Sequence, residues 1–142
     1  MKKILILNGP NINLTGLREK SVYGAKTYDD LIALCKSEAE KLGAEVRCIQ
    51  SNHEGDLIDM IHGAMGVYDG IVFNPGAYTH YSYALHDALK AVCVPCVEVH
   101  ISNIHEREEF RRVSVTAPAC VKQIYGHGLK GYLMAMDHFL GE

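Results

Sequence analysis

The middle of the chain reads Gly70-Ile71-Val72-Phe73-Asn74, a run that is apolar at every position between its first and last residues. A strand with one solvent face alternates apolar and polar side chains, whereas a strand buried on both faces is a continuous apolar run. The stretch therefore predicts an interior strand of a parallel sheet that is covered by helices on both faces.

Further strands and helices alternate on either side of this stretch. Strands are expected at residues 4–7, 45–50, 94–100 and 120–124, and helices at 28–42, 57–65, 79–92, 102–111 and 129–140. Thr27 with Asp30 forms a capping-box pattern at the start of the first helix. The order predicts an α/β fold, a single-domain, flavodoxin-like, doubly wound five-stranded parallel sheet over residues 1–142.

Composition excludes several classes of protein. The chain has 142 residues, which favours one domain, and its net charge of −3 without a basic block argues against nucleic-acid or anionic-membrane partners. Apolar runs of membrane-spanning length are missing, and residues 1–3 lead directly into a strand instead of a signal peptide. We therefore expect a cytoplasmic location.

The five cysteines do not suggest a disulfide framework, because their number is odd and their spacing scattered. Cys93 and Cys96 match C-x-x-C, but they follow a helix and enter a strand, the reverse of a thioredoxin-type pair. We expect buried, reduced thiols. Glycine-rich nucleotide loops and zinc-protease motifs are also missing from the sequence, so no metal and no cofactor is expected.

Polar side chains follow three of the expected strands. They are Asn8, Asn11 and Asn13 after the first, Asn74 to His80 after the third, and Glu98, His100, Ser102 and Asn103 in and after the fourth. Ligands of doubly wound sheets bind beyond the carboxyl ends of the strands, where these residues should meet. The set suggests a small, hydroxyl-bearing substrate, although each residue alone could be structural.

Two helical spacings extend this site. His80, Tyr83 and Asp87 would lie on one stripe of a helix, and Arg107 and Arg111 would share another helical face. Surface ion pairs or a subunit-facing edge would explain the same spacings. Ser102 would begin a helix whose free N–H groups could hold a carboxylate.

The segment from Gly16 to Gly24 has neither helical nor strand periodicity, and it carries Arg18 and Tyr23 between its glycines. A mobile lid that brings chemistry to a site would have this composition, and so would an ordinary surface loop.

The chain resembles type II 3-dehydroquinate dehydratase, the dehydroquinase of the shikimate and quinate pathways, essentially from end to end. The resemblance rests on residues 8–14, 18–24, 51–55, 74–80, 98–105 and 107–111. It implies a cofactor-free hydro-lyase of aromatic amino acid biosynthesis, or of quinate catabolism, that converts 3-dehydroquinate to 3-dehydroshikimate through an enolate. Lys20 stands where the family usually has proline, which should loosen the lid.

The resemblance also implies roles for individual residues. Tyr23 would be the base, His100 the proton donor, Arg18 the support of the base and Asn11 the residue that holds a water beside the enolate. The implied substrate-binding residues are Asn74, His80, Asp87, Ile101, Ser102 and Arg111, with Glu98 and Arg107 as supporting residues. Glu98 would either orient His100 or simply cap the sheet. Asp87 would reach a neighbouring subunit's site, within trimers grouped as dodecamers.

A second class of function fits the fold alone. A flavodoxin-like module that binds a flavin or nucleotide without catalysis would share the sheet, but it would not require the arginine and tyrosine of the lid or the paired histidines. A flavin absorption spectrum of the purified protein would favour that module.

Overall fold

The computed structural model describes residues 1–17 and 26–141. Its sheet consists of β1 (Lys3–Asn8), β2 (Glu45–Gln50), β3 (Gly70–Asn74), β4 (Cys96–His100) and β5 (Lys122–Tyr125). The strands lie in the order β2-β1-β3-β4-β5, and every neighbouring pair is parallel. The flavodoxin-like, doubly wound sheet predicted from the sequence is confirmed.

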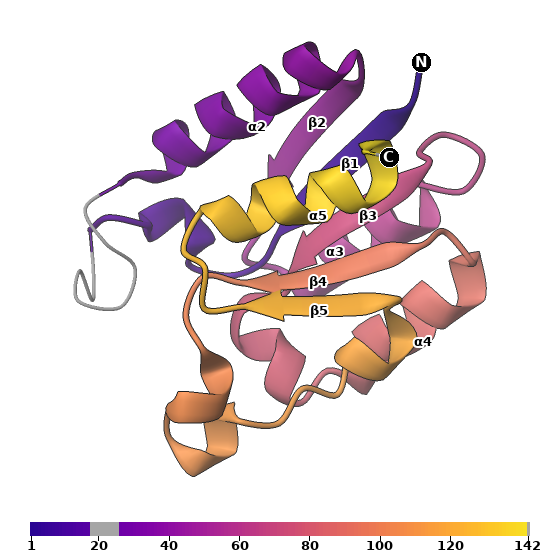
Figure 1. Ribbon diagram of the computed structural model, residues 1–142. Coiled ribbons are helices and arrows are strands. Elements are labelled where there is room, and N and C mark those ends of the chain that lie inside the picture. The colour runs from indigo at the N-terminus through magenta and orange to yellow at the C-terminus, as the bar shows by residue number, and fades with distance from the viewer. Residues whose placement is uncertain (18–25, 142) are drawn as a thin grey trace.

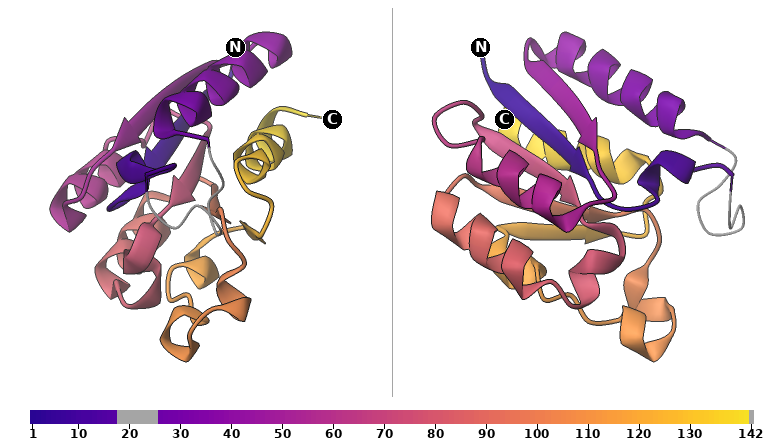
Figure 2. Two further views of the ribbon diagram at one scale, coloured as in Figure 1. Left: turned by 90° about the vertical axis from the view of Figure 1, so that its left-hand side faces the viewer. Right: turned by 180° about the vertical axis from the view of Figure 1, so that it is seen from behind.

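Helices cover both faces of the sheet (Figures 1 and 2). They are α2 (Tyr28–Leu42), α3 (Glu54–His62), α4 (Tyr83–Val92) and α5 (Lys130–Leu140). Helices α2 and α5 pack on one face, and α3 and α4 pack on the other. None of the helices in the described residues has the length and hydropathy needed to cross a membrane.

Successive side chains of one strand enter opposite cores. Ile4 and Ile6 of β1 belong to the core under α2 and α5, whereas Leu5 and Leu7 belong to the core under α3 and α4. These four side chains are at most 1% exposed. Burial on both faces explains why the strands read as continuous apolar runs.

The third helix begins later than predicted. Ser82 Oγ accepts a hydrogen bond from Leu85 N at 3.1 Å and caps α4, so the helix starts at Tyr83. The residues before it form a short 3-10 helix, η2 (Gly76–His80). His80 therefore does not share a helical stripe with Tyr83 and Asp87, and that prediction is wrong.

A helix over residues 102–111 is also a wrong prediction. The segment forms two 3-10 helices, η3 (Ile104–Glu106) and η4 (Glu109–Arg111), which are separated by the non-helical residues Arg107 and Glu108. Asn103 Oδ1 accepts from His105 N at 3.0 Å and starts η3 after Ser102. No α-helix begins at Ser102 in this described segment, so a carboxylate-binding helix N-terminus is excluded there.

Smaller corrections concern element ends and thiols. A further 3-10 helix, η5 (Ala117–Ala119), precedes β5, and both β4 and β5 start two residues later than predicted. Helix α3 ends at His62, before the predicted end at 65. Cys35 and Cys96 are buried, but Cys93 is exposed with a left-handed φ of 56°, which contradicts the expectation of buried thiols throughout.

Two-sided burial predicts the effect of truncation in β1. Ile4→Ala and Leu5→Ala remove neighbouring side chains from opposite cores, so each should lower the free energy of unfolding by about 2–5 kcal/mol. The exposed Met65→Ala variant should change it by at most about 0.5 kcal/mol. Urea denaturation measures all three, and tolerance of either β1 variant would contradict burial on that face.

Candidate active site

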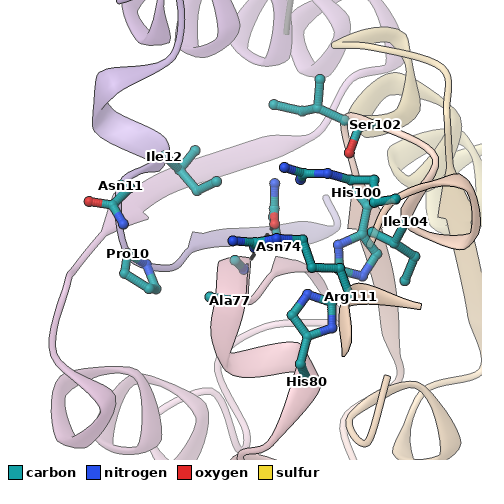
Figure 3. Close-up of a pocket in the computed structure, with 13 residues that line it drawn as sticks. Pro10, Asn11, Ile12, Asn74, Ala77, His80, His100, Ser102, Ile104 and Arg111 are labelled. Carbon is teal, nitrogen blue, oxygen red and sulfur yellow. Dashed lines mark hydrogen bonds between the residues drawn. The ribbon is translucent and has the colours of Figure 1, made fainter. Parts of the chain in front are cut away.

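A cavity of about 120 Å³ opens beyond the carboxyl ends of β1, β3 and β4 (Figure 3). Its wall is formed by Pro10, Asn11, Ile12, Asn74, Gly76, Ala77, His80, His100, Ile101, Ser102, Ile104, Arg107 and Arg111. These residues come from three separate segments, 10–12, 74–80 and 100–111, which the parallel sheet brings together. Most of the predicted site residues lie here.

The loops after β1 and β3 pack backbone against backbone. Gly9 N donates to Asn74 O at 2.8 Å, and a Cβ atom at Gly9 would collide with the carbonyl of Pro75. Gly76 has a φ of 63°, in the region that favours glycine, and a Cβ there would crowd Pro10 O at 3.0 Å. The glycines therefore let the two loops form one wall of the cavity.

Asn11 occupies a strained turn that a neighbouring loop supports. Its φ is 69°, a left-handed value that asparagine tolerates better than most residues. Asn11 N donates to Asn52 Oδ1 at 3.1 Å, and Gln50 Nε2 donates to the same oxygen at 3.0 Å and to Gly9 O at 3.1 Å. The connection between β2 and α3 thus holds Asn11 at the cavity.

The side-chain amide of Asn74 is held by hydrogen bonds at both its oxygen and its nitrogen. Its Oδ1 accepts from Gly76 N at 3.1 Å, and its Nδ2 donates to Tyr132 OH at 2.8 Å. The Tyr132 hydroxyl donates in turn to Asn8 Oδ1 at 2.6 Å. Asn8, expected at the cavity mouth, is instead buried beneath the wall, because its side chain faces this phenol.

The imidazole of His100 is paired with a buried carboxylate. His100 Nε2 lies 2.8 Å from Glu98 Oε2, and Glu98 is fully buried. Burial alone would raise the pKa of the Glu98 carboxyl, but the hydrogen bond and charge of His100, together with Thr116 and Gln123, hold the pKa to about 2. A carboxylate only accepts hydrogen bonds, so Nε2 carries the proton and Nδ1 is left for the cavity.

Hydroxyl and amide groups surround the same carboxylate. Ser114 Oγ and Gln123 Nε2 donate to Glu98 Oε2 at 2.8 and 2.9 Å, and Thr116 Oγ1 donates to Oε1. The Thr79 hydroxyl forms hydrogen bonds with the hydroxyls of Ser114 and Thr116, at 2.8 Å each. The sequence left two interpretations of Glu98, which would either orient His100 or cap the sheet. These contacts fit an orienting role better.

His80 enters the cavity from η2. Its Nδ1 lies 2.7 Å from Val113 O, and since a carbonyl only accepts, Nδ1 carries the proton and Nε2 is free to accept. Burial lowers the pKa of His80, and the nearby charges of His100, Arg111 and Arg107 lower it further against the opposing effect of the Val113 hydrogen bond. His80 is therefore neutral near pH 7.

The wall carries cations and no acid among the lining residues that the structure describes. Arg111 Nε donates to Glu108 Oε1 at 3.0 Å, and its guanidinium lies 4.8 Å from the centroid of the Phe110 ring. Figure 3 shows Arg111, His80 and His100 pointing into the same cavity. With Arg107 also in the wall, the cavity favours an anionic ligand.

Ile101 and Ser102 reach the cavity directly after β4. Their carbonyl oxygens accept from Gly128 N at 3.0 Å and from Gly126 N at 3.1 Å, so the connection between β5 and α5 fixes both residues. They therefore lie where the sequence predicted them, although no helix begins there.

Other predicted residues are not brought to the cavity. Asp87 lies on the exposed face of α4 and Asn13 is also exposed, and neither contributes to the wall. Arg18 and Tyr23 lie outside the described residues. Within the described part of the chain, no group of three or more His, Cys, Asp or Glu side chains could hold a metal ion.

Sequence reasoning missed the side chains behind the wall. Ser114, Thr116 and Tyr132 follow no local motif, because their partners are distant in the chain. Of these partners, only Gln123 could have been noticed in the sequence, because it is a polar residue within an expected strand. It is paired with Glu98 across β4 and β5.

Comparisons with known proteins agree with this geometry. The family model for dehydroquinase class II matches residues 2–140. A 3-dehydroquinate dehydratase of Clostridium perfringens is 60% identical over 95% of this chain and 94% of its own length. One from Caldicellulosiruptor bescii is 58% identical over 96% of this chain and 94% of its own.

A solved structure shares the fold as well as the sequence. The type II dehydroquinase of Butyrivibrio crossotus superposes with a TM-score of 0.96 at 54% identity, covering 97% of each chain. With matches over nearly the full length in both sequence and structure, the chain belongs to the class II dehydroquinase family.

Proposed function

We propose that the cavity is the active site of a hydro-lyase that removes water from 3-dehydroquinate to give 3-dehydroshikimate. The observation that carries this proposal is the buried Glu98–His100 pair facing a cationic cavity, in a chain of the class II dehydroquinase family. The proposed reaction requires a base, a stabiliser of the enolate and an acid.

Tyr23 is the proposed base and Arg18 its support, although both lie outside the described residues. A phenol has an ordinary pKa of about 10, so only about one in a thousand is ionised near pH 7. A guanidinium close by favours the phenolate. The phenolate takes a proton from the carbon beside the ketone, and the electron pair moves into the carbonyl to form the enolate.

His100 then completes the dehydration. Because Nε2–H is bound to ionised Glu98, the imidazolium gives up its proton from Nδ1, the nitrogen left for the cavity. The enolate reforms the ketone, a carbon–carbon double bond forms and the hydroxyl leaves as water. Glu98 accepts from Nε2–H and so keeps the imidazole oriented for this proton transfer.

The remaining wall suits the rest of the substrate. Arg107 and Arg111 attract a ring acid, and neutral His80 presents Nε2 as an acceptor for a substrate hydroxyl. Asn11 is proposed to hold a water beside the enolate. Asn74, Ile101 and Ser102 are proposed to bind polar groups of the substrate.

Several further expectations stay predictions. They are the cytoplasmic location, the single catalytic domain over residues 1–142, and the homo-oligomer of trimers grouped as a dodecamer. The alternative flavin- or nucleotide-binding module is not favoured, since the relatives that match nearly the whole chain are named as dehydratases.

Tyr23→Phe should retain the fold and lose turnover, because the hydroxyl is the proposed base while the ring remains. A continuous absorbance assay for the enone product of 3-dehydroquinate, run with and without a chelator, measures kcat, and circular dichroism checks the fold. A near-normal kcat in the Phe variant would remove Tyr23 from the chemistry.

Glu98→Gln should lower kcat by about 10²-fold, because an amide cannot stabilise the imidazolium. It should also change acid stability. The folded pKa of about 2 lies below the ordinary value of about 4.3, so the carboxylate stabilises the fold above about pH 4.3 and loses that effect as pH falls toward 2.

Denaturant midpoints measured at pH 7, 4 and 2.5 test this second effect. The wild-type midpoint should fall more steeply with acid than that of Glu98→Gln. Parallel curves for the two proteins would show that Glu98 does not contribute the expected pH dependence.

The shared-site role of Asp87 predicts complementation between subunits. Asp87→Ala and Tyr23→Phe should each be nearly inactive alone. Mixed oligomers, formed by dissociating and reassembling the two variants together, should regain part of the activity, because some sites then combine intact Tyr23 and Asp87. Mixtures that stay as inactive as the separate variants would place both residues in the same subunit's site, whereas a fully active Asp87→Ala variant would place Asp87 outside it.

A further inference from the structure

The hydroxyl of Tyr132 lies in the interior between two asparagines at the ends of neighbouring strands. Asn8 ends β1 and Asn74 ends β3, and the two residues are paired across the sheet. Tyr132 stands on the buried face of α5, with no exposed surface. Its hydroxyl therefore connects α5 to both strands directly beneath the cavity wall.

The number of available protons fixes the direction of each hydrogen bond. The neutral phenol has one proton, which it donates to Asn8 Oδ1 at 2.6 Å, so it must accept from Asn74 Nδ2 at 2.8 Å. Gly76 N donates to Asn74 Oδ1 at 3.1 Å. One N–H and one oxygen lone pair of Asn74 remain for the cavity, in a fixed orientation.

One end of this network lies in the core and the other faces the cavity. Asn8 Nδ2 is buried and forms no hydrogen bond of ordinary geometry in the described residues, although the Asn8 side chain also interacts with the Tyr28 hydroxyl. A buried donor without a full partner weakens a fold, whereas apolar residues of similar shape would avoid that cost. Asn74 is the member of the network that lines the cavity, so the network connects the core to the proposed binding site.

We infer that Tyr132 is a positioning residue for the dehydration, because its hydroxyl fixes the amide orientation with which Asn74 meets the substrate. This inference rests on the proposed function. Without the hydroxyl, Asn74 Nδ2 loses its partner, and the carboxamide is held by the Gly76 N bond to Oδ1 without a second anchor on Nδ2. Since Asn74 is assigned to binding, substrate and transition state should be affected alike, which raises KM and leaves kcat nearly unchanged.

Kinetics of Tyr132→Phe with 3-dehydroquinate test the inference. We expect KM to rise about five- to tenfold, which corresponds to the net contribution of about one hydrogen bond to binding. The kcat should stay within about twofold of wild type. Asn8→Ala should also raise KM, because the phenol proton is then free to turn toward Asn74. Unchanged KM in the two variants would overturn the inference.

A control and a double mutant separate positioning from simple destabilisation. Met136 lies one turn further along α5, is fully buried in the same core and contacts none of the three polar residues by hydrogen bond in the described structure. Met136→Ala should lower Tm and leave KM unchanged. In an Asn74→Ala background, Tyr132→Phe should cause no further rise in KM, and an additive rise would contradict the inference. A rise in KM in Met136→Ala equal to that in Tyr132→Phe would also contradict it.

A failure of the proposed function would be recognised separately. If wild-type protein did not dehydrate 3-dehydroquinate, the function would be wrong, whereas wild-type turnover with unaltered Tyr132→Phe kinetics would refute the positioning role alone. Hydrogen exchange of the Asn74 side-chain amide, followed by NMR, reports on orientation without turnover. Exchange should be faster in Tyr132→Phe, and equal rates would overturn the inference.

Discussion

A negative charge sits in the interior of this protein on the carboxylate of Glu98, none of whose surface reaches solvent. Burying an ion is costly unless it is paired and fully hydrogen-bonded, and here His100, Ser114, Thr116 and Gln123 all donate to it. These donors come from β4, β5 and the segment between η4 and η5. The orientation of His100 therefore depends on the correct assembly of all of these parts.

The cavity joins this histidine side to an asparagine side built on different elements. Close approach at Gly9 and Gly76 brings the loops after β1 and β3 together, while α5 supports Asn74 through a phenol. The ends of the strands thus hold the proposed acid and the proposed binding groups. The proposed base belongs to residues 18–25 instead, so the proposed binding and proton donation lie at the sheet, and the proposed proton abstraction lies on another part of the chain.

The sheet could be predicted because burial on both faces leaves continuous apolar runs in the sequence. The start of α2 could also be predicted, from the capping box of Thr27 and Asp30. The start of α4 and the 3-10 helices after β4 could not, since periodicity in residues 79–82 and 102–103 competes with capping by Ser82 and Asn103, and the caps prevail. The residues facing the cavity were predicted from their position after strands and from family resemblance. The donors that surround Glu98 were not predicted, because Ser114 and Gln123 lie 16 and 25 residues from it in the chain.

We propose that ionised Glu98 holds the Nε2 proton of His100 and leaves Nδ1 to deliver the proton that departs with water. NMR of protein labelled with ¹⁵N at histidine tests it directly, because the chemical shifts of the two ring nitrogens differ between tautomers. On this account, neutral His100 is the Nε2–H tautomer, and Nδ1 is the nitrogen without a proton. A neutral His100 found as the Nδ1–H tautomer would contradict the account.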